Sequence, residues 1–398
     1  MDVTRRSLLT GAGGAAVSAP AILSAQWRGS APLVTVVGAG VFGSWTAEQL
    51  RRRGARVTLV DAHGPAHSRS SSGGESRMTR AAYGPDEIYT RMALASLSEW
   101  QALSRVSGLP ILIPHGVLFF FQKDRAYLDA SLAVHRRLRL PTEELSAADM
   151  ARRFPMIDVT GVAGGLFEPR FGALMARRAV QTLVQRFLAA GGRFEQHQMD
   201  NSGRVPAADR IVLALGPWLP AMFPKLLGGR IVATRQEVFT FEAPAGDARF
   251  TPAMMPGWAD FNGGDVFYGF PDIEGKGVKF AHDAHGATVD PDRNDRRFTQ
   301  AALDKVVAFR DRRFPALRGA PLATAEVCQY ENSSNGDFLI DRHPTLENVI
   351  LVGGGSGHGF KHGPEVGRLA AELALDGKLP DSRFSLATKG SVQKRSVI

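Results

Sequence analysis

Apolar residues beyond the N-terminus are arranged first in a short unbroken run and then at helical spacing. Residues 33–37 form a continuous β-branched run, which is typical of a parallel strand buried on both faces. A glycine-rich loop follows, and the apolar spacing from about residue 41 to 53 predicts a helix that ends at Gly54. A second strand is predicted over residues 56–60, closing on Asp61. This order of elements predicts a βαβ unit.

The rest of the chain contains further helices and strands, and its pattern changes near residue 230. Helices are predicted over residues 86–103, 174–190 and 298–314 and from about Pro364, and strands over 116–122, 211–214 and 349–352. Residues 230–280 show alternating stretches such as Val238, Thr240 and Glu242, with glycine-rich turns at Gly263 and Gly264. The alternation indicates antiparallel sheet, whereas the strand over 349–352 returns to the parallel pattern.

These patterns predict an α/β fold in two parts. The first part is a Rossmann-type cofactor domain with a mixed, mainly parallel sheet, and the second is an inserted substrate domain of antiparallel sheet plus helix. We expect the cofactor domain to be discontinuous, over residues 31–112, 150–228 and 322–385. The substrate domain then comprises residues 113–149 and 229–321, and residues 386–398 are expected to form a flexible tail.

The loop after the first strand carries the chemistry that a dinucleotide requires. It reads GAGVFG, in which Gly38 permits a tight turn, Gly40 lets phosphates approach the backbone, and Gly43 allows close packing of helix on strand. The helix N-terminus presents N–H groups to an anion, and Asp61, 23 residues beyond Gly38, can bond ribose hydroxyls. We expect a bound dinucleotide here, although the motif alone does not separate FAD from NAD.

Charge and composition exclude few classes of protein. The 398 residues are 44% hydrophobic and 22% charged, which is ordinary globular material and enough for two domains. Lys and Arg exceed Asp and Glu by 48 to 39, but the basic residues are scattered and form no nucleic-acid track. The net charge of +9 therefore indicates solubility and attraction for anionic ligands.

The first 25 residues resemble a twin-arginine export signal. Arg5 and Arg6 precede an Ala- and Gly-rich apolar stretch, and Leu23 and Ala25 fit a small-residue cleavage site. Because this stretch contains glycines and Pro20 and is too short to span a bilayer, we expect no stable membrane insertion. The predicted location is the periplasm, or the cytoplasm if these residues are only a basic N-terminus.

Segments far apart in the sequence resemble one enzyme family. The chain reads SGGESRMTR over residues 72–80, and later GFPDIEGKGVKF, CQY and GGGSGHGFKHGPEVG. Together these resemble the monomeric sarcosine oxidase and N-methyltryptophan oxidase family, within the wider D-amino-acid-oxidase-like flavoproteins. The resemblance extends from about Leu33 to Phe384 and implies that the dinucleotide is FAD.

The resemblance implies a set of cofactor contacts and a covalent link. Cys328, the only cysteine, corresponds to the family residue that bonds to the flavin 8α-methyl carbon; a lone cysteine is otherwise a small buried apolar residue. The expected cofactor-binding residues are Gly38, Gly40, Val41, Phe42, Gly43, Asp61, Ser71, Ser76, Arg77, Cys328, Gly355, Gly357, His358, Gly359, Phe360 and Lys361.

The resemblance also implies the residues that act on a substrate. Arg80 and Lys361 would bind a carboxylate, the arginine with two hydrogen bonds and the lysine as a point charge, although each by itself is more often a surface residue. Lys279 corresponds to the lysine that activates oxygen, and Arg77 to the arginine beside the flavin. Tyr268 and Tyr330 would line the substrate cavity, where the alternative for a tyrosine is plain core packing.

Two positions depart from the family pattern. The family has a histidine at the loop position of Gly73 and another four residues after the Lys279 position, where this chain has Asp283. A carboxylate there favours a substrate with an extra cation or hydroxyl, or it pairs with a neighbouring lysine. His282, Asp283 and His285 lack a fourth partner, so no metal site is expected.

The expected activity is oxidation of an amine or amino acid, with a secondary N-methyl or cyclic amino acid as substrate and O2 reduced to H2O2. Alternatives are a periplasmic dehydrogenase that passes electrons to a carrier, and a flavin-holding subunit without turnover. A nicotinamide enzyme gives no reason for Cys328 or for the C-terminal glycine segment. We expect a monomer.

Overall fold

The computed structural model describes residues 30–200, 206–262 and 265–393. A six-stranded sheet has the strand order β16-β17-β10-β1-β2-β9 and is parallel except for β16, which runs antiparallel to β17. Its strands are β1 (Leu33–Val37), β2 (Arg56–Asp61), β9 (Arg193–Gln196), β10 (Arg210–Leu213), β16 (Leu339–Arg342) and β17 (Val349–Gly353). The chain therefore leaves this sheet after β10 and returns to it with β16 and β17.

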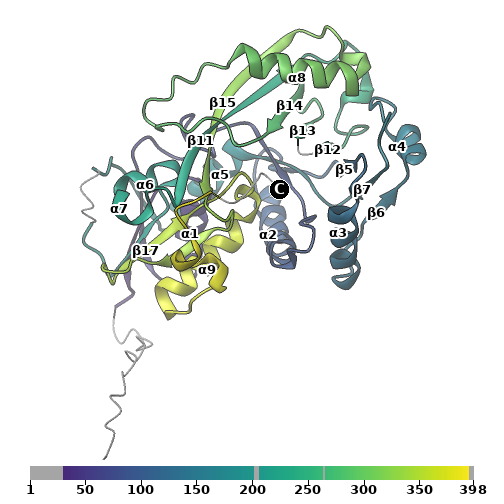
Figure 1. Ribbon diagram of the computed structural model, residues 1–398. Helices are drawn as coiled ribbons and strands as arrows, with labels where there is room; N and C mark the ends of the chain where they lie inside the picture. Colours follow the sequence, from purple (N-terminus) through teal and green to yellow (C-terminus); the bar gives the residue numbers. More distant parts are fainter. Residues whose placement is uncertain (1–29, 201–205, 263–264, 394–398) are drawn as a thin grey trace, which may run out of the picture.

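Helices from both ends of the chain pack beside this sheet, as Figure 1 shows for α1 and α9. They are α1 (Val41–Arg52), α2 (Glu87–Arg105), α5 (Ala176–Ala189) and α9 (Gly363–Asp376). Trp45 of α1 meets Trp100 of α2 edge to face, with ring centroids 5.2 Å apart. A Cβ at Gly367 of α9 would lie 2.6 Å from the Trp45 carbonyl carbon, so α9 approaches α1 closely only because residue 367 is glycine.

An eight-stranded sheet follows the order β15-β11-β14-β13-β12-β5-β7-β6 and is antiparallel except between β12 and β5. Its strands are β5 (Val117–Phe121), β6 (Glu143–Leu145), β7 (Gly164–Glu168), β11 (Ile231–Phe241), β12 (Gly257–Asn262), β13 (Asp265–Phe270), β14 (Val278–Asp283) and β15 (Leu322–Ser333). A smaller sheet, β3-β8-β4, comprises β3 (Ser76–Thr79), β4 (Leu112–Ile113) and β8 (Gly172–Met175).

The helix α8 (Gln300–Arg313) covers one face of the eight-stranded sheet, at the top of Figure 1. Trp258 of β12 stacks on Phe309 of α8 at 5.5 Å, and Arg313 donates to the buried Asp260 carboxylate at 2.9 Å. Because side chains alternate along a strand, Ala259 and Phe261 of β12 turn to the opposite face. That opposite face carries the chemistry described below.

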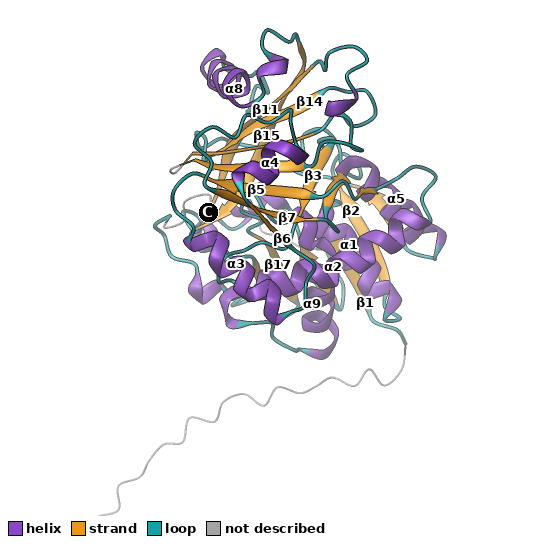
Figure 2. Cartoon of the chain, turned by 90° about the vertical axis from the view of Figure 1, so that its right-hand side faces the viewer, coloured by secondary structure: helices purple, strands orange, loops and turns teal. Residues whose placement is uncertain are grey.

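The remaining helices pack on the two larger sheets, and Figure 2 shows α3 and α4 beside the strands of the eight-stranded sheet. They are α3 (Ala126–Arg137), α4 (Ala147–Arg153), α6 (Leu219–Met222) and α7 (Pro224–Leu227). The helices α6 and α7 contribute Leu219, Met222 and Leu227 to an apolar cluster with β10 and β17. The six-stranded sheet is thus covered on both faces, which explains the unbroken apolar run of β1.

The α/β fold with mixed sheets is confirmed, and several expected boundaries are wrong. The helix predicted from Leu174 begins at Ala176, because Leu174 belongs to β8 and pairs with Arg77. The strands β7 and β15, expected in the cofactor domain, belong to the eight-stranded sheet. Lys389, expected in a flexible tail, is buried and donates to the Arg383 carbonyl at 2.7 Å.

Two expectations concern residues that the structure does not describe. The export signal over residues 1–25 and the turn at Gly263 and Gly264 lie outside the described residues. Within the described ranges, no helix combines the length and the apolar character needed to cross a membrane.

Candidate active site

Two adjoining cavities lie between the six-stranded and the eight-stranded sheets. The first, of about 290 Å³, extends from the Gly38 loop to β15, and the second, of about 350 Å³, lies on the inner face of the eight-stranded sheet. The residues that border both cavities are Arg77, Cys328, Tyr330, Gly357 and Phe360. Any reaction between two bound molecules, one in each cavity, would occur at this junction.

The glycine loop packs tightly against neighbouring backbone on one side and is open to the first cavity on the other. Gly38 has a φ of +105°, and a Cβ there would lie 2.2 Å from the Ala214 carbonyl oxygen. A Cβ at Gly43 would lie 1.8 Å from the Gly38 oxygen, whereas one at Gly40 meets nothing nearer than Ser72 Oγ at 3.5 Å. The loop therefore holds α1 against β1 and leaves room for a ligand beside Gly40, as phosphate binding requires.

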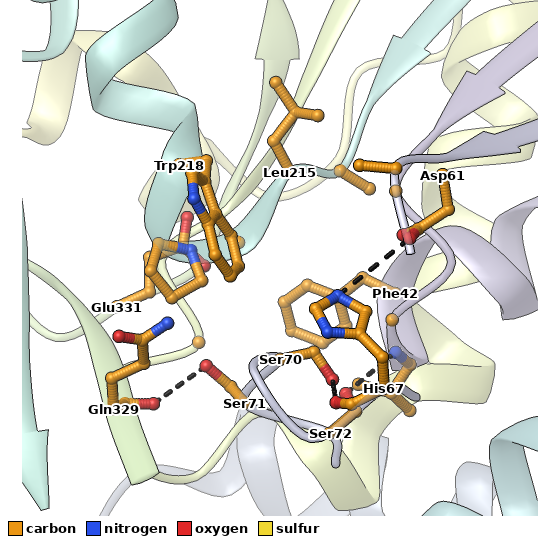
Figure 3. Close-up of a pocket in the computed structure, with 18 of the residues that line it drawn as sticks. Phe42, Asp61, His67, Ser70, Ser71, Ser72, Leu215, Trp218, Gln329 and Glu331 are labelled. Carbon is orange, nitrogen blue, oxygen red and sulfur yellow. Dashed lines mark hydrogen bonds and ion pairs between the residues drawn. The ribbon is translucent and has the colours of Figure 1, made fainter. Parts of the chain in front are cut away.

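Asp61 borders the first cavity and also braces the glycine loop (Figure 3). Its carboxylate accepts hydrogen bonds from the backbone N–H groups of Ala39 at 2.8 Å, His63 at 2.8 Å and Gly64 at 2.9 Å. His67 Nε2 lies 3.9 Å from the same carboxylate. A cavity bordered by both a helix N-terminus and a carboxylate fits a dinucleotide.

A strap over residues 290–296 reaches the first cavity from the eight-stranded sheet side. The Asp292 carboxylate accepts from Arg69 at 3.0 Å and from the Trp218 indole N–H at 2.9 Å. Arg296 donates to the Arg69 and Val327 carbonyls at 2.9 and 3.2 Å. Sequence reasoning missed the strap, because nothing in a run of polar residues indicates which distant loop it will contact.

Cys328 lies at the junction, on β15. Arg77 Nη2 is 3.5 Å from the sulfur and donates to the Ser71 carbonyl at 2.6 Å, so the guanidinium is fixed beside the thiol. A fixed cation near a thiol is the environment in which cysteines act as nucleophiles. The predicted pairing of Cys328 with a cationic site is thus present.

Lys279 enters the second cavity from β14 and is only 8% exposed. Its ammonium donates to the Ser76 carbonyl at 3.0 Å and to the Ser76 hydroxyl at 3.2 Å. Burial, reinforced by the charge of Arg77, lowers the pKa of Lys279 to about 7. Lys279 can therefore change its charge near neutral pH.

Arg80 and Lys361 come together at one wall of the second cavity, as predicted for a carboxylate site. Both lie over the Tyr83 ring, with the guanidinium carbon 4.2 Å and the ammonium nitrogen 5.3 Å from its centroid. Arg80 donates to the Ala82 carbonyl and lies 3.4 Å from the Tyr127 hydroxyl, and Lys361 donates to the His358 carbonyl at 2.9 Å.

A buried carboxyl supports the segment that carries Arg80. Glu168 of β7 is fully buried, and both of its oxygens lie 3.1 Å from the Ala81 N–H. Burial raises the pKa of Glu168 to about 7, against the lowering effect of that hydrogen bond. The imidazole of His135 lies 3.6 Å away. Sequence reasoning missed Glu168, because a single acidic residue at a strand end has no motif.

Asp283 and two tyrosines, Tyr268 and Tyr330, also line the second cavity. The Tyr330 hydroxyl donates to Asp283 Oδ1 at 3.1 Å. Burial raises the pKa of Tyr268 to about 12. The neighbouring His282 turns to the α8 side and pairs with Asp265 at 2.9 Å, because adjacent strand residues point to opposite faces.

The predicted site residues divide between the two cavities. Those that line the first are Gly38, Gly40, Val41, Phe42, Asp61, Ser71, Arg77, Cys328, Tyr330, Gly355, Gly357, Gly359 and Phe360. Those that line the second are Arg77, Arg80, Tyr268, Lys279, Asp283, Cys328, Tyr330, Gly357, His358, Phe360 and Lys361. Gly43 and Ser76 border neither cavity; the first packs on Gly38 and the second holds Lys279.

Sequence reasoning missed several residues that line the cavities. His67, Trp218, Asp292 and Glu331 border the first, and Tyr83 and Tyr127 border the second. Burial raises the pKa of the Glu331 carboxyl to about 7. Only two of these residues had a usable signal, since Tyr83 lies three positions after Arg80 and Glu331 follows the CQY motif.

Comparisons with known proteins agree with this geometry. Monomeric sarcosine oxidase from Bacillus sp. (strain B-0618) is 30% identical over 92% of this chain and 98% of the relative. N-methyl-L-tryptophan oxidase from Salmonella newport (strain SL254) is 31% identical over 88% of this chain and 98% of the relative.

Solved structures share the fold at lower identity. The amino acid oxidase NikD of nikkomycin biosynthesis has a TM-score of 0.72 at 22% identity, covering 90% of this chain and 98% of that structure. L-proline dehydrogenase from P. horikoshii has a TM-score of 0.77 at 19% identity, covering 90% and 97%. The model of the family described as DAO, FAD dependent oxidoreductase, matches residues 34–373, so the chain belongs to the FAD-dependent oxidoreductases of this family.

Proposed function

We propose that this protein oxidises the C–N bond of a secondary amino acid, N-methylated or cyclic, to an imine, with O2 reduced to H2O2. The observation that carries the proposal is the junction of the two cavities. There a dinucleotide site ends at Arg77 and Cys328, beside a second cavity that holds the paired cations Arg80 and Lys361. Relatives at 30 and 31% identity are named as sarcosine and N-methyl-L-tryptophan oxidases, which supports the substrate class.

In this proposal the chain's residues hold and orient the substrate. Arg80 and Lys361 bind its carboxylate, while Tyr268 and Tyr330 exclude water from the reacting carbon. Bound FAD supplies the acceptor for the hydrogen and the two electrons that leave this carbon. The nitrogen lone pair forms the C=N bond of an iminium, which releases its N–H proton to solvent to give the imine, and water then hydrolyses the released imine.

Cys328 is proposed to bond covalently to the flavin. The nearby Arg77 guanidinium and the position of the sulfur at the junction support this role. Acid-precipitated wild-type protein should keep its yellow colour, whereas Cys328→Ala should release its flavin into the supernatant. Release of all flavin from the wild type would contradict the covalent link.

Lys279 is proposed to promote the reaction with O2, because a buried ammonium stabilises negative charge that develops beside it. Lys279→Met should slow reoxidation of the reduced protein by O2 while leaving its reduction by substrate nearly unchanged. If reoxidation is equally fast in the variant, the alternative of a dehydrogenase that uses an electron carrier is favoured.

A substrate screen tests the proposed reaction. Sarcosine, L-proline, pipecolate and N-methyl-L-tryptophan are offered in air, and H2O2 is measured. At least one should give peroxide in proportion to substrate consumed. Consumption without peroxide would favour the carrier-linked dehydrogenase, and no consumption would favour a flavin-holding subunit.

Location and assembly are proposed on the sequence alone. The twin-arginine-like segment over residues 1–25 supports export to the periplasm, and cytoplasmic location is the alternative. Cell fractionation with and without Arg5→Lys and Arg6→Lys tests this. We propose that the protein is a monomer, which light scattering of the purified protein tests.

A further inference from the structure

We infer that Glu168 and His135 form a proton-sharing pair behind Arg80, and that near neutral pH the second cavity takes up a proton from solvent on this pair when it binds a carboxylate. This inference rests on the carboxylate site of the proposed function. Glu168 is 0% and His135 1% exposed, and neither residue borders a cavity. The pair therefore acts on a ligand through the charges in front of it and not by touching it.

The pair consists of two lone-pair atoms that face each other in the protein interior. His135 Nε2 lies 3.6 Å from Glu168 Oε1 and is buried without a hydrogen-bond partner among the described residues. The Thr142 hydroxyl lies 2.9 Å from His135 Nδ1 and itself donates to the Leu140 carbonyl at 3.3 Å, so Nδ1 carries the ring proton and donates to Thr142. A second proton, placed between the imidazole and the carboxyl, converts their repulsion into a hydrogen bond.

Burial favours the uncharged form of both members of the pair. It raises the pKa of the Glu168 carboxyl to about 7 and lowers the pKa of the His135 imidazole. The Ala81 N–H, 3.1 Å from both carboxyl oxygens, and the charge of Arg80 favour the ionised carboxyl instead. The shared proton therefore resides on Glu168 at low pH and leaves as the pH rises through neutrality.

The charges that act on Glu168 lie toward the second cavity. The charged and titratable side chains that interact with the pair or with Arg80 are Arg80, Lys361, Tyr83, Tyr127, Asp283 and His362. On the side of β5, Glu168 pairs with the buried apolar Val117. Of these groups, the cations Arg80 and Lys361 favour the ionised form of Glu168 directly.

A bound carboxylate changes this balance. Its negative charge offsets Arg80 and Lys361, so Glu168 holds its proton more tightly in the complex. Because coupling between two bound species is reciprocal, the protonated protein also binds the carboxylate more tightly. The affinity for carboxylates should therefore fall as the pH rises through neutrality. A tenfold fall in affinity corresponds to uptake of roughly half a proton at the midpoint.

The test is made on Lys279→Met holoprotein, because Lys279 borders the same cavity and also changes charge near pH 7. Furan-2-carboxylate, which is ionised at every pH used, is the probe, and its dissociation constant is measured from the flavin absorption between pH 6 and 9. Calorimetric titration at the midpoint, in two buffers of different ionisation enthalpy, counts the protons taken up. The dissociation constant should rise several-fold to about tenfold, with uptake of roughly half a proton.

Glu168→Gln, added to Lys279→Met, imitates the protonated carboxyl. Its amide oxygen can accept from the Ala81 N–H while its NH2 group donates to His135 Nε2. This variant should bind furan-2-carboxylate as tightly at pH 9 as at pH 6 and take up no proton. If Glu168 only supported the fold, the same change would weaken binding at every pH.

Two further variants in the Lys279→Met protein complete the test. Ser131→Ala removes another buried hydrogen bond to the same segment, the one from the Gly84 N–H at 2.8 Å, and should keep the proton uptake. His135→Leu should move the midpoint to lower pH, because the protonated carboxyl loses its acceptor, and it tests the pair even if the glutamine variant does not fold. Equal uptake with and without Glu168→Gln, an unmoved midpoint in His135→Leu, or no carboxylate binding at any pH would overturn the inference.

The outcome is separable from that of the proposed function. Furan-2-carboxylate is only a ligand, so proton uptake is measured whether or not any amine is oxidised. Carboxylate binding without proton uptake, in a protein that oxidises an amine, would contradict the inference alone. Proton-coupled binding in a protein that oxidises no amine would contradict the proposed function and leave the Glu168–His135 pair in place.

Discussion

Lys279 is a buried amine whose charge depends on pH near neutrality. Its surroundings lower its pKa from the ordinary 10.5 to about 7, mainly through burial. An unfolded chain would hold this proton up to about pH 10, so the unfolded state binds more protons than the folded state between pH 7 and 10. The free energy of unfolding therefore rises with pH over this range. Lys279 destabilises the folded state least above its unfolded pKa, and that stability is lost as the pH falls toward 7.

Replacement of Lys279 by methionine should remove this pH dependence. Lys279→Met should be more stable than the wild type at pH 7, and its advantage should shrink as the pH rises to 10, because the wild-type amine no longer pays for a buried charge. Unfolding midpoints in urea from pH 7 to 10 measure this. Lys276→Met is the control, because the Lys276 side chain is 47% exposed. Its stability relative to the wild type should show no such dependence on pH. A constant difference between Lys279→Met and wild type would refute the lowered pKa.

Residues of the site differ in how far the sequence reveals them. Cys328, Arg80, Lys279 and Lys361 stand in motifs whose order resembles a known family, and the structure brings all four to the second cavity. Glu168 had no such signal, because its importance comes from the Ala81 N–H that it meets across 87 positions of sequence. Local patterns do not contain that kind of contact.

The packing of α1 against β1 requires a residue without a side chain at position 43. A Cβ at Gly43 would lie 1.8 Å from the Gly38 carbonyl oxygen, and neither backbone can yield without separating α1 from β1. Gly43→Ala should therefore destabilise the fold by about 2 kcal/mol or more and lower the flavin content.

Thermal unfolding and the ratio of flavin to protein absorbance measure the effect of Gly43→Ala. Gly108→Ala is the matched control, since a Cβ there meets nothing within 4 Å. The control should keep its flavin and its melting temperature. Equal behaviour of the two variants would show that close packing at Gly43 is unimportant.

Secondary-structure elements were predicted well where one short pattern determines them. The βαβ unit and the antiparallel region from residue 230 are found as expected, because burial on two faces or on one face leaves a distinct apolar pattern. The assignment of β7 and β15 failed, since a strand's pattern does not identify the sheet it joins. Only pairing partners, such as β11 for β15, decide that.

At the scale of the whole molecule, the strap over residues 290–296 connects the two large sheets across the first cavity. Asp292 joins Arg69 and Trp218, which belong to segments beside the six-stranded sheet. These contacts predict that the strap helps to retain the cofactor.

The effect of the strap can be measured when the flavin is not covalently held. In a Cys328→Ala background, Asp292→Ala should release flavin several-fold faster than its parent. Flavin fluorescence after dilution measures the release, and Asp304→Ala, on the exposed face of α8, is the control. Equal release rates would exclude the strap from cofactor retention.

The two adjoining cavities lead to one central claim. An amino acid held by Arg80 and Lys361 gives up its electrons at the junction beside Cys328. Anaerobic mixing tests it most directly. The purified yellow protein is mixed without O2 with sarcosine, L-proline, pipecolate or N-methyl-L-tryptophan, and the flavin absorption is followed. We predict saturable bleaching by at least one of them; an unchanged flavin spectrum with all four would contradict the account.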